Sequence, residues 1–339
     1  MYSQDVTYRD VEAAARRIAP HVHRTPVLSS EQLSRRLGGQ IYFKCENFQK
    51  AGAFKSRGAC NAVFRLDAGI AERGVATHSS GNHGAALARA ARRRGIPAYV
   101  VMPRGAADVK RQAVAGYGAT VIECEPTIQA REAAAAELVA RTGATLIHPY
   151  DDPDVIAGQG TATLELAEAI APPALVLAPV GGGGLLSGTA IVARHLWPGA
   201  KVLGAEPAGA DDAARSIARG IRQHQSDPKT IADGLRGELS DRTFALIRTY
   251  VDRIVTVSEP AIVEGMRLVW QYLKIVIEPS AAVPVAALIE HPLLTDAGAA
   301  IVILSGGNVD LDALPWVSAP VPVRTKRRAP ARSKPRARR

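Results

Sequence analysis

Cysteine is scarce in this chain of 339 residues, and long apolar runs are missing. The three cysteines, Cys45, Cys60 and Cys124, form no CxxC pair and lack the spacing of metal ligands. We therefore expect neither a disulfide framework nor a zinc site, and a reducing compartment, the cytoplasm, is favoured. The N-terminus, MYSQDVTYRD, has no apolar signal-peptide core, and no stretch offers about 20 unbroken apolar residues. We accordingly expect no membrane span.

Outside its C-terminal end, the chain also lacks an excess of basic residues. The net charge is +10, but residues 321–339 hold nine Lys or Arg and no acidic residue. The rest of the chain has 33 basic against 32 acidic residues, so it is close to neutral. We expect 319–339 to be a disordered basic tail, because it cannot bury enough apolar surface to fold. This tail carries no aromatic residues that could stack on bases, so it gives little support for a nucleic-acid partner or a scaffold role.

The pattern of apolar residues predicts an α/β fold. Hydrophobic residues make up 47% of the chain and charged residues 22%, which excludes disorder as the main state. Short apolar runs alternate with alanine-rich helical stretches, as in proteins with a mainly parallel sheet covered on both faces. The predicted strands are 41–44, 74–77, 98–102, 120–123, 175–180, 201–205, 253–257 and 299–304. The predicted helices include 85–94, 127–142 and 156–169.

A glycine tetrad follows the predicted strand 175–180. Gly181, Gly182, Gly183 and Gly184 stand before a helical pattern, where free backbone N–H groups and the helix dipole suit a phosphate. No lysine follows as in a P-loop. On its own the tetrad is also explained by a tight strand-to-helix turn. Glu206, about 20 residues further on, gives a partial dinucleotide-binding fingerprint, so an NAD-dependent oxidoreductase is an alternative.

Two more segments with small polar residues follow predicted strands, where ligands bind in open α/β sheets. The first is the SSGNHG segment, Ser79-Ser80-Gly81-Asn82-His83-Gly84, whose hydroxyls, amide and helix-start N–H groups suit a carboxylate. Alone, it is also explained by an ordinary helix cap with a structural histidine. The second is Ser305-Gly306-Gly307-Asn308, which offers one hydroxyl or simply a turn.

Lys55 lies in an unusually apolar setting for a lysine, within the segment AGAFKSRGA. Desolvation in such a site lowers the pKa of the amine and favours the neutral form that a Schiff base needs. By composition alone, a solvated surface lysine is the favoured explanation.

Together these segments resemble the fold-type II pyridoxal-phosphate (PLP) enzymes, in the branch of serine/threonine dehydratases and serine racemases. The order matches: the lysine motif, SSGNHG, the glycine tetrad and SGGN. The stretches RTPVLSS (24–30), HPYDDPDVIAGQGT (148–161), TIADG (230–234) and IEPS (277–280) match as well. The resemblance covers about residues 8–315 and implies a tryptophan synthase β-like fold with two open, twisted, mainly parallel sheets. It also implies a large domain of 1–74 and 151–318, a small mobile domain of 75–150, and a homodimer.

The resemblance implies a role for each motif. Lys55, next to Phe54, would hold PLP as a Schiff base and remove the Cα proton of an amino acid substrate. Gly181, Gly182, Gly183 and Gly184 would bind the phosphate, Asn82 the ring hydroxyl and Ser305 the ring nitrogen. A hydroxyl at the ring nitrogen, rather than a carboxylate, gives a weaker electron sink, which suits elimination better than transamination. The residues expected around the substrate are Ser79, Ser80, Gly81, Asn82 and His83.

The resemblance favours β-elimination of L-serine- or L-threonine-type β-hydroxy amino acids to a 2-keto acid and ammonia. One alternative is a serine racemase with Lys55 and Ser80 on opposite faces of the cofactor, and another is a threo-3-hydroxyaspartate dehydratase. Tyr150 and Gly237 replace an Asn and a Ser of the racemase pattern, which weighs against racemisation as the main activity.

The stretch AEPAGADD at 205–212 resembles the divalent-cation site of the racemase-like branch. The Glu206 and Asp212 carboxylates and the Ala210 carbonyl, completed by waters, would offer the oxygen shell that Mg²⁺ or a similar cation requires. The alternative for Asp211-Asp212 is a helix N-cap.

Overall fold

The computed structural model describes residues 6–79, 81–105, 108–292 and 298–317. Helices and strands alternate along most of this length, as the sequence predicts. The strands are β1 (Val27–Leu28), β2 (Ile41–Cys45), β3 (Val75–His78), β4 (Ala98–Pro103), β5 (Thr120–Cys124), β6 (Thr145–Leu146), β7 (Leu175–Pro179), β8 (Lys201–Pro207), β9 (Arg253–Val257) and β10 (Ala300–Leu304). The α-helices are α1 (Tyr8–Ile18), α2 (Glu31–Arg36), α3 (Lys55–Arg65), α4 (Ala68–Ala71), α5 (Asn82–Arg94), α6 (Asp108–Gly116), α7 (Ile128–Thr142), α8 (Pro153–Leu164), α9 (Gly184–Leu196), α10 (Asp212–Arg219), α11 (Asp241–Tyr250), α12 (Glu259–Leu273) and α13 (Pro279–Glu290).

The strands form two sheets, which confirms the predicted α/β class with mainly parallel sheets. The order of the larger sheet is β1-β2-β10-β7-β8-β9, and that of the smaller is β5-β4-β3-β6. All described pairings are parallel except that of β1 with β2. The sequence missed β1 and β6, because two residues are too few to show a strand pattern.

Both faces of the larger sheet are covered by helices. In β10, Val302 and Leu304 point into a core shared with α12 and α13, whereas Ile301 and Ile303 point into the core formed with α9 and α11. This alternation explains why the strands read as unbroken apolar runs. One predicted helix, 156–169, is split: α8 ends at Leu164 and a 3-10 turn, η3 (Glu165–Glu168), follows.

Helices α3 and α8 connect the two sheets. Helix α3 packs against α5 of the smaller sheet and against α8, which packs in turn against α9 of the larger sheet. Glycines allow these close approaches: a Cβ on Gly158 would lie 2.6 Å from the Cα of Gly58, and a Cβ on Gly188 would lie 2.6 Å from the backbone N of Gly160. Helices α3 and α9 begin at Lys55 and Gly184, which are both proposed to bind the cofactor. The packing of these helices on α8 therefore sets the distance between the two cofactor-binding residues.

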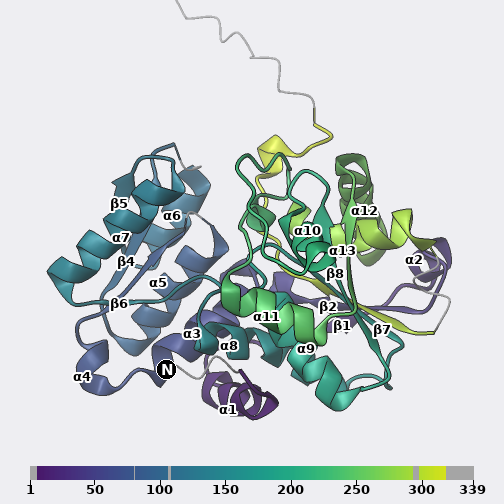
Figure 1. Ribbon diagram of the computed structural model, residues 1–339, viewed down its shortest axis with the longest axis horizontal. Coiled ribbons are helices and arrows are strands. Elements are labelled where there is room, and N and C mark those ends of the chain that lie inside the picture. Colours follow the sequence, from purple (N-terminus) through teal and green to yellow (C-terminus); the bar gives the residue numbers. More distant parts are fainter. Residues whose placement is uncertain (1–5, 80, 106–107, 293–297, 318–339) are drawn as a thin grey trace, which may run out of the picture.

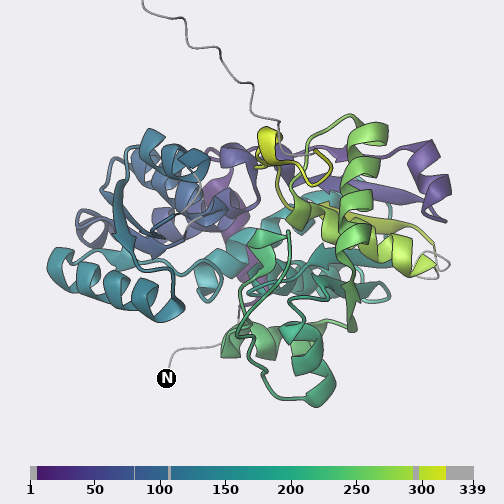
Figure 2. The same cartoon turned by 90° about the horizontal axis from the view of Figure 1, so that it is seen from above.

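The smaller sheet forms a separate lobe in both views (Figures 1 and 2), to one side of the larger sheet. Its strands all fall between residues 75 and 146, and the larger sheet is built from segments on either side of them. This arrangement supports our proposal of a small domain at 75–150 inserted into a large one. None of the helices in the described ranges is both long and apolar enough to cross a membrane. The predicted tail, 319–339, lies outside the described residues.

Candidate active site

A cavity of about 440 Å³ lies where strands of both sheets end. His78 at the end of β3, Pro179 at the end of β7 and Ser305 just after β10 all line it. Carboxyl ends of parallel strands are where open α/β sheets bind ligands, and the volume suits a small molecule with its cofactor. The three described segments with small polar residues, 79–84, 181–184 and 305–308, and the lysine motif all contribute lining residues here.

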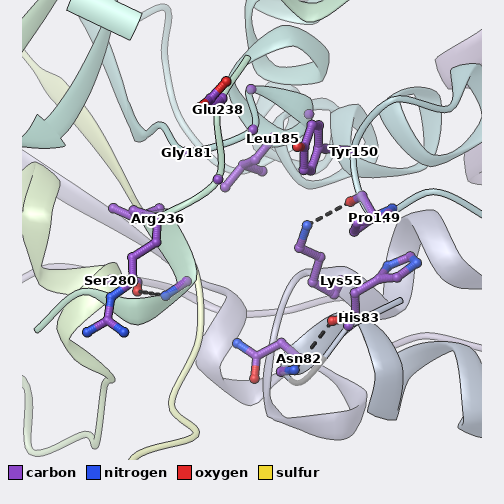
Figure 3. Close-up of a pocket in the computed structure, with 18 of the residues that line it drawn as sticks. Lys55, Asn82, His83, Pro149, Tyr150, Gly181, Leu185, Arg236, Glu238 and Ser280 are labelled. Atoms are coloured by element: carbon purple, nitrogen blue, oxygen red, sulfur yellow. Dashed lines mark hydrogen bonds between the residues drawn. The ribbon is translucent and has the colours of Figure 1, made fainter. Parts of the chain in front are cut away.

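Lys55 enters the cavity from the first residue of α3 (Figure 3). Its Nζ donates a hydrogen bond to the carbonyl oxygen of Pro149 at 2.7 Å and lies 5.0 Å from the centre of the Phe54 ring. Burial lowers the pKa of Lys55 to about 8, although the negative charge of Glu278 acts in the opposite direction. Near neutral pH, a larger fraction of this amine is therefore neutral than in a solvated lysine, as the sequence predicts for a nucleophilic lysine.

The glycine tetrad forms a turn whose first three residues leave no room for a side chain. A Cβ on Gly182 would lie 2.3 Å from the Tyr150 ring, and one on Gly181 would lie 2.8 Å from the Cα of Leu235. Gly183 is the N-cap of α9 with φ of +86°, a left-handed conformation that favours glycine. The turn therefore exposes the start of α9 to the cavity without a capping side chain, as a phosphate site requires.

The SSGNHG segment leads from β3 into α5. Ser79, Gly81, Asn82 and His83 line the cavity, and Ser80 lies outside the described residues. His83 is buried, its Nε2 lies 3.3 Å from the carbonyl oxygen of Ile147, and burial together with Lys55 lowers its pKa well below the usual value. A neutral His83 therefore donates from Nε2 to that carbonyl.

Ser305 is buried beside the lysine motif. Its carbonyl oxygen accepts a hydrogen bond from the Phe54 backbone N–H at 3.0 Å, and Ala53 pairs with Gly306 in an isolated bridge. The end of β10 is thus held next to the start of α3, which places Ser305 and Lys55 on one wall of the cavity.

Several lining residues were not assigned a role from the sequence. Among them are His148, Arg131, Arg236, Glu278 and Ser280. Glu278 and Ser280 belong to the IEPS stretch, which was matched as a motif without a function. The Ser280 Oγ accepts a hydrogen bond from Gly234 N at 3.0 Å, which joins IEPS to TIADG (Figure 3). Arg131 lies in the alanine-rich helix α7, which carries no local signal of a binding site.

His148 presents a neutral donor to the cavity. Its Nδ1 accepts hydrogen bonds from the backbone N–H groups of Tyr150 and Asp151, at 3.3 and 2.8 Å, so the proton of the neutral ring is on Nε2. Burial and the nearby His78 lower the pKa of His148 to about 4. The ring therefore stays neutral at physiological pH. Tyr150 packs edge-on against it, with 4.5 Å between the ring centres, and burial raises the pKa of Tyr150 to about 12.

The predicted cation ligands lie at the end of β8 and the start of α10. Glu206, Ala210 and Asp212 are all buried, and burial raises the pKa of Glu206 to about 9 and that of Asp212 to about 6. One Glu206 oxygen accepts from Ala214 N at 2.6 Å, and the other, Oε2, has no hydrogen-bond partner. Such an orphaned buried oxygen fits a cation ligand. The described residues hold no cluster of three or more His, Cys, Asp or Glu arranged for a metal, so carbonyls and waters would complete the shell.

Asp211 stands at the N-cap position of α10 but makes no side-chain cap. Its carboxylate pairs instead with Arg215 at 2.7 Å. The simple N-cap interpretation of Asp211-Asp212 is therefore wrong for Asp211.

The cavity fits PLP on its own geometry. A half-buried lysine of lowered pKa, a glycine turn whose first three residues leave no room for a Cβ, and a buried serine lie on its walls. The model of the family described as "Pyridoxal-phosphate dependent enzyme" matches residues 18–307. The chain belongs to this family. The predicted fold type and the PLP cofactor are thereby confirmed, and the NAD-dependent alternative loses its support.

Known proteins similar to the chain include dehydratases and racemases. A β-hydroxyaspartate dehydratase of Paracoccus denitrificans is 50% identical over 310 residues, which is 91% of this chain and 98% of that protein. A serine racemase of Dictyostelium discoideum is 47% identical over 313 residues, covering 91% and 97% of the two chains. The solved structure of maize serine racemase superposes with a TM-score of 0.89 at 44% identity and covers 90% of this chain and 94% of that one. The predicted PLP-dependent lyase or racemase branch is therefore confirmed.

Proposed function

We propose that this enzyme eliminates the β-hydroxyl group of a β-hydroxy-α-amino acid and releases a 2-keto acid and ammonia. The observation that carries the proposal is the half-buried Lys55, whose amine has a lowered pKa and lines a cavity together with the glycine turn and Ser305. The 50% identity to a dehydratase over nearly the whole chain supports elimination. The Tyr150 and Gly237 positions, which depart from the racemase pattern, also line this cavity.

Bound PLP would supply an electron sink for the negative charge that develops at Cα. Lys55 Nζ would hold the cofactor covalently, yield it to the substrate amine, and then take the Cα proton. A pKa of about 8 suits a base that works near neutral pH. The backbone N–H groups of Gly181–Gly184 would hold the phosphate. The segment with Ser79, Asn82 and His83 would bind the substrate carboxylate.

Among β-hydroxy amino acids, we propose 3-hydroxyaspartate as the preferred substrate. Such a substrate brings a second carboxylate, and Arg131 lines the same cavity. The Arg131 Nε donates to the carbonyl oxygen of Thr127 at 3.4 Å, and no carboxylate in the described part of the chain forms an ion pair with it. Its charge is thus available to an anionic ligand. The neutral Nε2–H donor of His148 lines the cavity as well, and the similar Paracoccus protein is named for this substrate.

Replacing Arg131 with methionine should change substrate preference. We expect kcat/KM for L-threo-3-hydroxyaspartate to fall about 100-fold, since a hydrogen-bonded charge pair to the second carboxylate is lost. The value for L-serine, which has no second carboxylate, should change less than about threefold. Coupled assays of oxaloacetate and pyruvate measure both. Arg141→Met, on the exposed end of the same helix, is the matched control. Equal losses on both substrates would contradict the assignment of Arg131.

Serine racemisation is the second candidate, because serine racemases at 47% and 44% identity cover the chain almost as fully. The resemblance assigns the second acid/base group to Ser80, of which the structure says nothing because it lies outside the described residues. Chiral chromatography after incubation with L-serine separates the two activities. Pyruvate with little D-serine supports the lyase, and D-serine in excess over pyruvate supports the racemase.

We also propose that Glu206, Asp212 and the Ala210 carbonyl bind Mg²⁺. Cation binding should stabilise the fold, by about 2.7 kcal/mol at 100 times the dissociation constant. We therefore expect added Mg²⁺ to raise the melting temperature and expect Glu206→Gln to abolish the increase, because Gln lacks the charge. Differential scanning fluorimetry measures this, with Glu72→Gln at an exposed position as the control. An equal Mg²⁺ response in Glu206→Gln would rule out this site.

A further inference from the structure

Glu278 is a buried carboxylate in the cavity that the proposed reaction does not use. It is the N-cap residue of α13, it is 6% exposed, and it lines the cavity. Its Oε1 accepts a hydrogen bond from the Asn82 Nδ2 at 2.8 Å. A Cβ on Gly306 would lie 2.3 Å from this same Oε1. The first glycine of the SGGN segment thus leaves the space that the carboxylate of the IEPS segment fills.

The bond from Asn82 to Glu278 is part of a chain of three hydrogen bonds. The Asn308 Nδ2 donates to the Ala51 carbonyl oxygen at 2.8 Å and to the Asn82 Oδ1 at 2.9 Å. Asn82 then donates from Nδ2 to Glu278. A carbonyl at one end and an ionised carboxylate at the other can only accept, so the direction of every bond between them is fixed.

This chain of bonds determines how Asn82 faces the cavity. The Asn82 Oδ1 already accepts from Asn308, and one of the two Nδ2 hydrogens goes to Glu278. The other Nδ2 hydrogen is left for a ligand, so Asn82 can meet the ring oxygen of the cofactor as a donor. Asn82 begins α5 beside the smaller sheet, whereas Glu278 and Asn308 flank β10 of the larger sheet, so the bonds also join the two walls of the site.

We propose that Glu278 is a positioning residue, which fixes the Asn82 amide as a hydrogen-bond donor to the PLP ring. This inference rests on the proposed function, because it assumes that the cavity binds PLP through Lys55 and Asn82.

The test compares Glu278→Ala, Asn82→Ala and the double variant with the wild-type enzyme. The readouts are the dissociation constant of PLP, measured by titrating the apoenzyme, and the visible circular dichroism of the bound cofactor, which reports its orientation. We expect Glu278→Ala to raise the dissociation constant about 10- to 100-fold and to alter the dichroic band. We expect the double variant to bind no more weakly than Asn82→Ala, because Glu278 acts through Asn82.

Glu278→Gln keeps the shape of the side chain and serves if Glu278→Ala does not fold. The Gln amide can present either its oxygen or its NH₂ group to Asn82, so the hydrogen bond is kept in one of the two orientations. We therefore expect a smaller loss of PLP affinity than in Glu278→Ala, and a change of the dichroic band in the same direction. Glu72→Gln, at an exposed position, is the control. Wild-type affinity and dichroism in the Glu278 variants, or losses that add fully to those of Asn82→Ala, would overturn the positioning role alone. A wild-type protein that forms no borohydride-reducible bond with PLP would overturn the proposed function instead.

Discussion

Replacing Lys55 with alanine is expected to lower kcat/KM on the preferred substrate by at least about 10⁴-fold. The variant loses two functions at once, because the same Nζ is proposed to hold PLP covalently and to take the Cα proton. The amine that supplies both is partly desolvated, and this desolvation lowers its pKa to about 8. The measurement is the rate of keto acid release with saturating PLP.

Lys50→Ala is the matched control, since Lys50 lies five residues upstream but does not line the cavity. We expect this variant to keep wild-type turnover and a borohydride-reducible chromophore, and Lys55→Ala to lose both. If Lys55→Ala retains turnover, Lys55 is not the catalytic lysine.

Replacing Arg57 with methionine is expected to lower the free energy of unfolding by about 3–5 kcal/mol. Arg57 is fully buried two residues after Lys55, and its guanidinium donates to both oxygens of Glu46, at 2.7 and 2.8 Å. It also donates to Glu165 at 2.6 and 3.0 Å. Without Arg57, the buried Glu46 carboxylate loses its ion pair. The Glu165 carboxylate keeps its ion pair with Lys44, at 2.5 Å. Breaking a buried pair is costly because it leaves a charge uncompensated.

Urea denaturation of the PLP-loaded enzyme measures this effect as a lower midpoint with an unchanged slope. Arg65→Met is the control from the same helix: Arg65 pairs with Asp154 at the surface, where an ion pair contributes about 0–1 kcal/mol. If the two variants lower the midpoint equally, the buried cluster does not stabilise the start of α3.

The order of strands and helices could be predicted from the sequence because the longer strands are mostly short apolar runs that alternate with alanine-rich helical stretches. The glycine tetrad and SGGN could be expected near a ligand because each follows a predicted strand, whereas the lysine motif was placed in the same site through the family resemblance. The two-residue strands β1 and β6 gave no pattern to detect. The split of 156–169 into α8 and η3 was also missed, because the stretch carries no Gly or Pro where α8 ends.

Residues whose role depends on the folded arrangement could not be predicted. Arg131 looks like one more charged residue of an exposed helix until α7 is placed beside the cavity. The neutral state of His148 follows from the folded structure, in which its Nδ1 accepts hydrogen bonds from two backbone N–H groups. Glu278 was seen as part of a motif, but its contact with Asn82 spans 196 positions of the chain. The homodimer and the cytoplasmic location stay predictions.

The central claim is that PLP is bound covalently at Lys55, and one measurement tests it directly. The PLP-loaded enzyme is reduced with borohydride, digested, and analysed by mass spectrometry for the pyridoxyl adduct. The account predicts a single modified peptide that contains Lys55. A pyridoxyl group on another lysine, such as the buried Lys44, or no adduct at all, would contradict it.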